Sequence, residues 1–186
     1  MEKLRILVDW DDCLNDLVDQ LLILYEKRFA EHIDKESITN FDLSESLPPE
    51  QSSKLYSLFI DEELWKSVKV QPGAAKAVQE MIADGHEVFI VTATDYRNVV
   101  WKMEWLQKNL PFFPIQNVII TSQKHLLAAD YLIDDNLDNL RRGIYGRIVI
   151  DKPWNRDVRE DIYDIKRATN LKEAYQIIKK QMEQND

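Results

Sequence analysis

Apolar residues in this chain gather into short runs separated by longer segments of mixed character. Nearly continuous apolar runs of this length are typical of strands that are covered on both faces. The runs span residues 4–9, 87–91, 117–121, 130–134 and 147–150. Helical periodicity covers residues 72–84, 95–109, 136–142 and 170–184. Strands that alternate with helices predict a parallel sheet with right-handed crossovers.

One region interrupts this alternation. Residues 16–70 contain no convincing strand, and helical patterns occupy 16–32 and 49–66. We therefore predict an α/β fold: a Rossmann-like parallel sheet core with helices on both faces and a small helical cap inserted after the first strand. The core comprises residues 1–15 and 71–186, and the cap comprises 16–70. The charged, turn-rich residues 151–169 predict a surface loop before the last helix.

The composition restricts the class of protein. With 186 residues, 45% of them hydrophobic, the chain can bury one core with a modest insertion. Its net charge of −9 repels nucleic-acid phosphates, so we expect no nucleic-acid polymer as a partner. No apolar run approaches the roughly 20 residues of a membrane span, so no membrane partner is expected either.

The only cysteine, Cys13, cannot form an internal disulfide, which fits a reducing compartment. The N-terminus is too short and too acidic for a signal peptide. We expect a cytoplasmic protein that is a monomer or a homodimer.

Polar side chains with catalytic potential follow four of the predicted strands. In order along the chain, they are Asp9 and Asp11, Thr92-Ala93-Thr94, Lys124, and Asp134-Asp135. The carboxyl ends of parallel strands meet at one edge of a sheet, so these groups can converge there. Two acidic clusters, a hydroxyl and a lysine suit the handling of a phosphoryl group beside Mg²⁺.

The two carboxylates of the first group can divide the chemistry of phosphate ester hydrolysis. Asp9 can attack phosphorus and form an aspartyl-phosphate, which splits one difficult step into two. Asp11 can protonate the leaving oxygen and later deprotonate the attacking water. Taken alone, each of these residues has an ordinary structural interpretation as a turn, a helix cap or a surface lysine. Their order at successive strand ends makes chance coincidence improbable.

These residues resemble the four motifs of the haloacid dehalogenase-like phosphatases, in the same order and over the whole chain. The resemblance implies Asp9 as nucleophile and Asp11 as general acid and base. It implies Mg²⁺ held by Asp9, the backbone carbonyl of Asp11 and an aspartate of the pair Asp134-Asp135, with Asp135 favoured as the direct ligand. It also implies phosphate contacts from Thr92, from the backbone that follows at Ala93 and Thr94, and from Lys124.

Several segments resemble more narrowly the 5'(3')-deoxyribonucleotidase family. They are residues 70–74 (Val-Gln-Pro-Gly-Ala), Trp105-Leu106 and residues 132–136 (Leu-Ile-Asp-Asp-Asn). The chain departs from that pattern at three positions: Asp12 replaces the usual glycine, Leu17 replaces an aromatic residue, and Ala93 replaces a serine. Trp154 and Asn155 resemble a recurring segment of bacterial relatives, without an evident role in the mechanism.

Most aromatic residues of the predicted cap are expected to form its own small core. Trp65 and Phe41 are the candidates for stacking on a base or a sugar of the substrate. The sequence thus predicts a Mg²⁺-dependent phosphomonoesterase that hydrolyses a small phosphate ester, in particular a (deoxy)nucleoside monophosphate. A phosphatase of a non-nucleotide substrate, a phosphotransferase and a phospho-accepting signalling domain are the alternatives.

Overall fold

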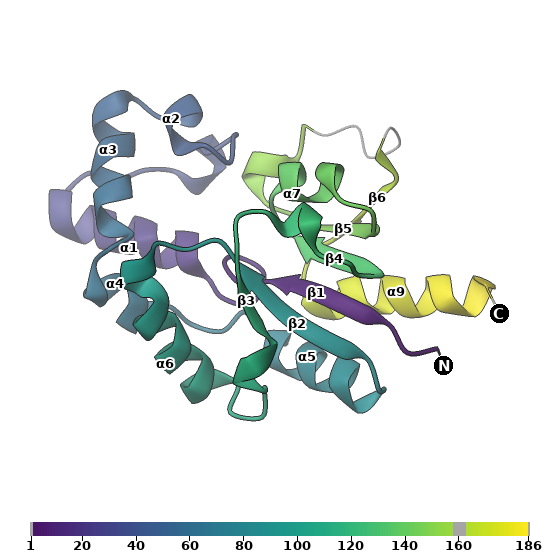
Figure 1. The fold of residues 1–186 in the computed structure, drawn as a ribbon. Coiled ribbons are helices and arrows are strands. Elements are labelled where there is room, and N and C mark those ends of the chain that lie inside the picture. Colours follow the sequence, from purple (N-terminus) through teal and green to yellow (C-terminus); the bar gives the residue numbers. More distant parts are fainter. Residues whose placement is uncertain (1, 158–162, 186) are drawn as a thin grey trace.

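Six parallel strands form one sheet in the computed structural model, which describes residues 2–157 and 163–185 (Figure 1). The strands are β1 (Arg5–Asp9), β2 (Glu87–Thr92), β3 (Val118–Ile120), β4 (Tyr131–Asp134), β5 (Gly146–Ile150) and β6 (Ile165–Ala168). Their order across the sheet is β3-β2-β1-β4-β5-β6, and every neighbouring pair is parallel. The predicted fold class is therefore confirmed.

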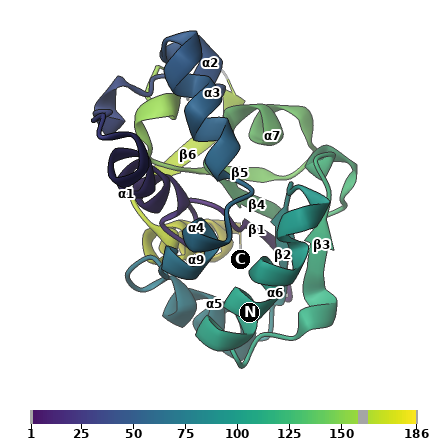
Figure 2. The same cartoon turned by 90° about the vertical axis from the view of Figure 1, so that its left-hand side faces the viewer.

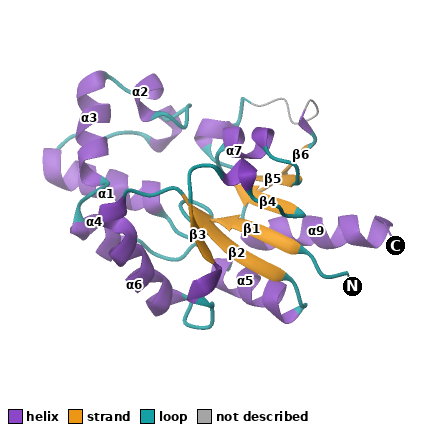
Figure 3. Cartoon of the chain, viewed as in Figure 1, coloured by secondary structure: helices purple, strands orange, loops and turns teal. Residues whose placement is uncertain are grey.

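The sheet is buried on both faces, as the continuous apolar runs predict. In β1, Ile6 and Val8 belong to one cluster of buried side chains, whereas Leu7 belongs to a second cluster on the opposite face. This separation follows from the alternation of side chains along a strand. Helices α5 (Ala74–Ala83), α6 (Val99–Asn109) and α9 (Leu171–Asn185) add buried side chains to the first cluster, and α7 (Leu137–Arg142) to the second (Figure 3).

The strand order reverses between β1 and β4. The chain proceeds from β1 outward to β2 and β3, then returns to place β4 on the other side of β1. At such a reversal the connections leave in opposite directions, and a crevice opens outside the carboxyl ends of the two strands. Asp9 and Asp134 are the last residues of β1 and β4, so the topology places both carboxylates at this crevice.

The inserted segment is helical and lies beyond the carboxyl ends of the strands (Figures 1 and 2). Its helices are α1 (Leu17–Phe29), α2 (Leu43–Ser46), α3 (Pro49–Leu58) and α4 (Glu62–Ser67). The predicted helix at 49–66 is thus interrupted, because Asp61 caps a new helix by accepting a hydrogen bond from the Glu63 N–H. Among the described residues, no helix has both the length and the apolar character needed to cross a membrane.

The two connections between the insertion and the sheet run side by side. Asn15 and Val70 form an antiparallel bridge. The N–H of Asp16 donates to the carbonyl of Lys69 at 3.1 Å, and the N–H of Gln71 donates to the carbonyl of Leu14 at 2.8 Å. The division into a cap at 16–70 and a core stays a prediction, and these hydrogen bonds lie at its boundaries.

The predicted surface loop at 151–169 is wrong in part, because β6 lies within it. This strand is at the edge of the sheet and pairs only with β5. An edge strand requires little apolar sequence, and only Ile165 and Ala168 of its residues are buried, while Lys166 is exposed. The apolar signal of β6 is therefore too short to separate it from the charged residues around it.

The two isoleucines around β5 provide a test of this packing. Ile148 lies in β5 and is fully buried, whereas Ile144, just before the strand, is 96% exposed. We expect Ile148→Ala to lower the free energy of unfolding by about 2–5 kcal/mol, because it leaves a cavity in the core. Ile144→Ala, which removes the same atoms from the surface, should change it by less than about 0.5 kcal/mol. Urea denaturation of both variants measures the difference, and equal effects would contradict the packing described.

Candidate active site

The loop after β1 brings three carboxylates into one tight turn. Asp9 ends the strand, and Asp11 and Asp12 follow after one intervening residue, Trp10. The backbone of Asp12 has a φ of +58°. The side chain of Asn15 closes the turn, since its Oδ1 accepts hydrogen bonds from the N–H groups of Asp12 at 3.0 Å and Leu17 at 3.2 Å. Its Nδ2 donates to Oδ1 of Asp11 at 3.1 Å, so the turn also orients that carboxylate.

Lys124 joins the carboxyl ends of β1 and β4. Its Nζ donates to Oδ1 of Asp9 and, at 2.7 Å, to Oδ2 of Asp134. Asp134 is fully buried and accepts two further hydrogen bonds, from the Asn136 N–H at 2.8 Å and from Nδ2 of Asn139 at 3.1 Å. These contacts fix Asp134, and Asp134 in turn fixes the lysine beside Asp9.

Burial dominates the electrostatics of this cluster. It raises the pKa of Asp9 well above its ordinary value, with the ammonium of Lys124 acting in the opposite direction and Asp134 and Asp135 adding to the rise. Burial alone would lower the pKa of Lys124, but Asp134 and Asp9 raise it overall. The lysine is therefore a permanent cation beside a carboxylate that still lacks full compensation of its charge.

Trp154 and Asn155 hold Asp135 from the end of β5. The indole Nε1 of Trp154 donates to Oδ2 of Asp135 at 2.9 Å. Nδ2 of Asn155 donates to the carbonyls of Asp135 at 2.9 Å and Ile150 at 2.8 Å. Both side chains are buried, although sequence reasoning assigned them to a surface loop without a role. Their position directly after a predicted strand is the signal that could have identified them, because all strands end at the same edge.

Three buried residues offer ligand atoms that are close enough to share a metal ion. A carboxylate oxygen of Asp9, one of Asp135 and the Sγ of Cys13 all lie within 4.8 Å of one another. Burial and the nearby carboxylates raise the pKa of the Cys13 thiol, which disfavours the thiolate form that binds metals. Two buried carboxylates that lack full compensation are a donor set that fits a hard divalent cation.

Besides Lys124, the residues predicted to bind phosphate lie at the end of β2. Thr92 is buried, and its Oγ1 accepts a hydrogen bond from Nζ of Lys102 at 2.6 Å. Ala93 and Thr94 follow it and line the cleft described below. Thr92 is therefore a buried support of the site, while Ala93 and Thr94 line the cavity.

Sequence reasoning missed Lys102. This lysine on α6 is fully buried, and its Nζ donates to Oδ2 of Asp11 as well as to Thr92. Its ammonium also faces the rings of Trp10 and Trp65, with 5.3 and 5.1 Å to the ring centroids. The signal for it is its place on the apolar stripe of the predicted helix 95–109, one turn before the buried Trp105 and Leu106, where a lysine is rarely found without a partner.

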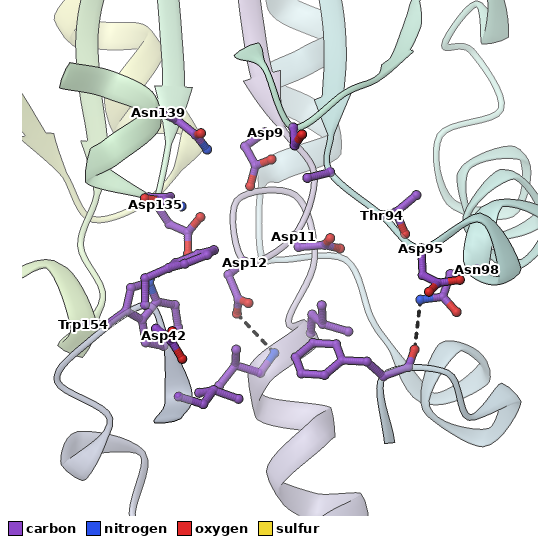
Figure 4. A pocket seen from close by; sticks show the side chains of 18 of the residues that line it. Asp9, Asp11, Asp12, Asp42, Thr94, Asp95, Asn98, Asp135, Asn139 and Trp154 are labelled. Atoms are coloured by element: carbon purple, nitrogen blue, oxygen red, sulfur yellow. Dashed lines mark hydrogen bonds between the residues drawn. The ribbon is translucent and has the colours of Figure 1, made fainter. Parts of the chain in front are cut away.

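A cleft of about 710 Å³ separates the insertion from the carboxyl ends of the strands. Figure 4 shows Asp9, Asp11, Asp12 and Asp135 turned toward it. The insertion contributes apolar and aromatic walls to this cleft: Ile38, Phe41, Leu43, Tyr56, Phe59, Ile60 and Trp65. One end of the cleft is thus acidic, and the other is suited to the flat, apolar faces of an organic group.

Both predicted pocket residues line this cleft. Phe41 is 54% exposed and forms part of its wall, whereas Trp65 is almost fully buried. The indole Nε1 of Trp65 donates to the carbonyl of Phe59 at 2.9 Å, and Nδ2 of Asn98, on the core, donates to the same carbonyl at 3.0 Å (Figure 4). Trp65 therefore lies where the insertion contacts the core.

Asp12 serves the fold as well as the cleft. Its Oδ1 accepts a hydrogen bond from the Val18 N–H, in the first turn of α1, at 3.3 Å (Figure 4). Burial raises its pKa to about 7, with Lys152 acting in the opposite direction. The free N–H groups at the start of a helix favour an acidic side chain, so this carboxylate links the loop after β1 (residues 10–16) to the insertion.

Comparison with known proteins identifies the family. Residues 3–183 match the family model described as 5' nucleotidase, deoxy (pyrimidine), cytosolic type C protein. The chain belongs to this nucleotidase family. Membership makes it a phosphoric monoester hydrolase, which confirms the predicted class of enzyme and contradicts a signalling domain.

Curated relatives of this nucleotidase family match most of the chain. The 5'(3')-deoxyribonucleotidase of Clostridium acetobutylicum is 30% identical over 171 residues, which cover 89% of this chain and 94% of that protein. The 5'(3')-deoxyribonucleotidase of Bacillus subtilis is 27% identical over 157 residues, covering 83% and 89%. The narrower resemblance predicted from the sequence is therefore confirmed.

Solved structures support the fold at lower identity. A haloacid dehalogenase-like protein from Agrobacterium tumefaciens has a TM-score of 0.66 at 12% identity, covering 97% of this chain and all of that one. A haloacid dehalogenase-like hydrolase from Streptococcus pneumoniae has a TM-score of 0.60 at 15% identity, covering 89% and 93%. These likenesses establish that the nucleotidase chain has a haloacid dehalogenase-like fold.

The role of Lys124 in holding the site together can be tested through stability. We expect Lys124→Met to lower the free energy of unfolding by about 3–5 kcal/mol, because Asp9 and Asp134 are left buried without their cation. Lys108→Met, on the exposed face of α6, is the matched control and should change it by less than about 0.5 kcal/mol. Urea denaturation in the presence of a chelator measures both. A similar, small effect of both substitutions would contradict this description.

Proposed function

We propose that this protein is a Mg²⁺-dependent phosphatase of (deoxy)nucleoside monophosphates that acts through an aspartyl-phosphate. The proposal rests on one arrangement above all: Asp9 faces an aromatic-walled cleft while its other side is held by the buried ammonium of Lys124. The relatives from Clostridium acetobutylicum and Bacillus subtilis carry the name 5'(3')-deoxyribonucleotidase, which supports the choice of substrate.

In the first step, a carboxylate oxygen of Asp9 attacks the phosphorus of the ester. A bond forms between that oxygen and phosphorus, and the bond from phosphorus to the leaving oxygen breaks. Asp11 gives its proton to the leaving oxygen, so the product departs as an alcohol. Lys124 neutralises charge on the phosphoryl oxygens, and the backbone at Ala93 and Thr94 provides N–H groups for the same purpose.

In the second step, water hydrolyses the aspartyl-phosphate. Asp11, now ionised, takes a proton from the attacking water, and the bond between phosphorus and the Asp9 oxygen breaks. This step releases inorganic phosphate and restores both carboxyl groups to their starting states. Asp11 is suited to both duties because it remains 24% exposed at the cleft while its neighbours are buried.

Mg²⁺ would be held by Asp9, by Asp135 and by the backbone carbonyl of Asp11. When bound, it supplies positive charge that reduces the repulsion between a carboxylate and a phosphate dianion. Asp135 suits this duty because, within the described part of the chain, its side chain accepts a single protein hydrogen bond, from Trp154. Asp134 is the less suitable ligand, since Lys124, Asn136 and Asn139 already use its oxygens.

The leaving group would occupy the aromatic end of the cleft. Phe41 and Tyr56 are about half exposed there, so an aromatic base can stack on them without displacing a packed side chain. Trp65 would support the wall rather than stack on the base, because its ring is buried. The cytoplasmic location and the oligomeric state stay predictions.

The function can be tested by measuring phosphate release from nucleoside monophosphates, sugar phosphates and small acid phosphates. We expect deoxynucleoside monophosphates to be the best substrates, and activity to disappear with a chelator and return with Mg²⁺. Asp9→Asn should lower kcat by at least about 10³-fold, because the nucleophile is lost. Uniformly weak activity on nucleotides would contradict the proposed choice of a nucleotide as substrate. Full activity of Asp9→Asn would contradict the covalent mechanism.

The proposed metal ligand can be tested through Trp154. Trp154→Phe keeps an aromatic ring but removes the N–H that orients Asp135. We expect it to weaken Mg²⁺ binding by about 10-fold, since groups that orient a ligand affect metal affinity on this scale. Titration calorimetry measures the affinity without any substrate. Trp101→Phe, outside the residues that line the cleft, is the control, and unchanged affinity in Trp154→Phe would contradict Asp135 as a ligand oriented by Trp154.

A further inference from the structure

The ammonium group of Lys102 is enclosed by other side chains. The residue has no exposed surface, although it is located on a surface helix of the sheet core. The indole rings of Trp10 and Trp65 face this ammonium, with ring centroids 5.3 and 5.1 Å from Nζ. Trp10 belongs to the loop after β1, and Trp65 belongs to the insertion. The cation is thus enclosed jointly by the two parts of the chain.

The polar contacts of this ammonium are equally specific. It donates to Oδ2 of Asp11 and, at 2.6 Å, to Oγ1 of Thr92. A buried ammonium is costly to desolvate unless it is paired, and indole faces provide the most favourable aromatic contact for a cation. These contacts together hold the amine of Lys102 at one point, beside the carboxyl group of Asp11.

The hydrolysis described above makes no use of Lys102. Lys124 neutralises the phosphoryl group, and within residues 2–157 and 163–185 no hydrogen bond or ion pair joins Lys102 to Asp9 or Asp135. The whole arrangement around Lys102 instead converges on Asp11. Since a general acid must meet the leaving oxygen at hydrogen-bond distance, the orientation of its carboxyl group decides whether it can act.

We propose that Lys102 is a positioning residue, which holds Asp11 in the orientation required to protonate the leaving group. It fixes one oxygen of Asp11, and Asn15 fixes the other at 3.1 Å, so the carboxyl plane is set from two sides. The ring of Trp65 makes this arrangement depend on the insertion being docked on the core. Asp11 is therefore aligned when the cleft is complete.

The inference rests on the proposed phosphatase function, and it predicts a dependence on the leaving group. Benzyl phosphate releases a strongly basic alkoxide unless a proton is supplied, whereas p-nitrophenyl phosphate of similar size releases a weakly basic phenolate. A general acid therefore matters much more for the first ester than for the second. A purely structural defect would affect both esters equally, because they share the same phosphoryl group.

The experiment compares kcat/KM of Lys102→Met for the two esters, since this ratio reports the step in which the leaving group departs. We expect a decrease of about 10²-fold or more for benzyl phosphate, and of less than about 10-fold for p-nitrophenyl phosphate. Lys108→Met, at an exposed position on the same helix, should leave both values unchanged. Equal losses for the two esters, or no loss for either, would overturn the positioning role.

A double variant locates the effect. If Lys102 acts through Asp11, adding Lys102→Met to Asp11→Asn should cause little further loss with benzyl phosphate. A full additional loss would mean that Lys102 acts elsewhere. Should Lys102→Met fail to fold, Lys102→Arg keeps the charge with a different shape and should show the same contrast between esters. A wild-type protein that hydrolyses no phosphate ester, deoxynucleoside monophosphates included, would instead overturn the proposed function itself, and the inference with it.

Discussion

The buried ammonium of Lys124 between Asp9 and Asp134 is the interaction on which the active site depends. Parallel strands β1 and β4 are neighbours, so their last residues, both aspartates, are forced close together at low exposure. Two buried carboxylates at that spacing repel each other strongly, and a single cation that contacts both removes most of the repulsion. The lysine comes from the short turn after β3 (residues 124–126), where the chain returns from the edge of the sheet. The strand order thus brings the two carboxylates together, and it also returns the chain so that Lys124 lies between them.

Two lysines divide the acidic cluster between them. Lys124 contacts Asp9, the proposed nucleophile, and Lys102 contacts Asp11, the proposed acid. These aspartates are two positions apart in the sequence, yet their partners come from different elements, α6 and the turn after β3. Separate partners can hold two nearby carboxyl groups in different orientations. The distinct chemical duties proposed for Asp9 and Asp11 therefore have a structural basis in α6, the helix after β2, as well as in the loop after β1.

The parallel sheet and the convergence of Asp9, Lys124 and Asp135 could be predicted because continuous apolar runs mark buried strands and strand ends share one edge. The contributions of Trp154 and Lys102 could not be predicted in the same way. Trp154 follows β5 within a charged segment that has the character of a surface loop. The apolar pattern of the edge strand β6 is too weak to show that Trp154 is buried beside the sheet. Lys102 lies on a helix, where spacing indicates a buried position but cannot identify which distant carboxylate and rings enclose the amine.

Asp12 illustrates how a departure from a family pattern can be absorbed by the fold. Its backbone occupies the left-handed region that favours glycine, so an aspartate there carries a conformational cost. Its burial, which raises its pKa, adds an electrostatic cost. The hydrogen bond from the Val18 N–H offsets part of both, because it places the carboxylate at the positive end of α1. The loop after β1 and the first helix of the insertion are thereby fastened to each other, and a glycine at this position would leave that contact to water. The substitution is consequently better explained by the attachment of the insertion than by a change in the chemistry of hydrolysis.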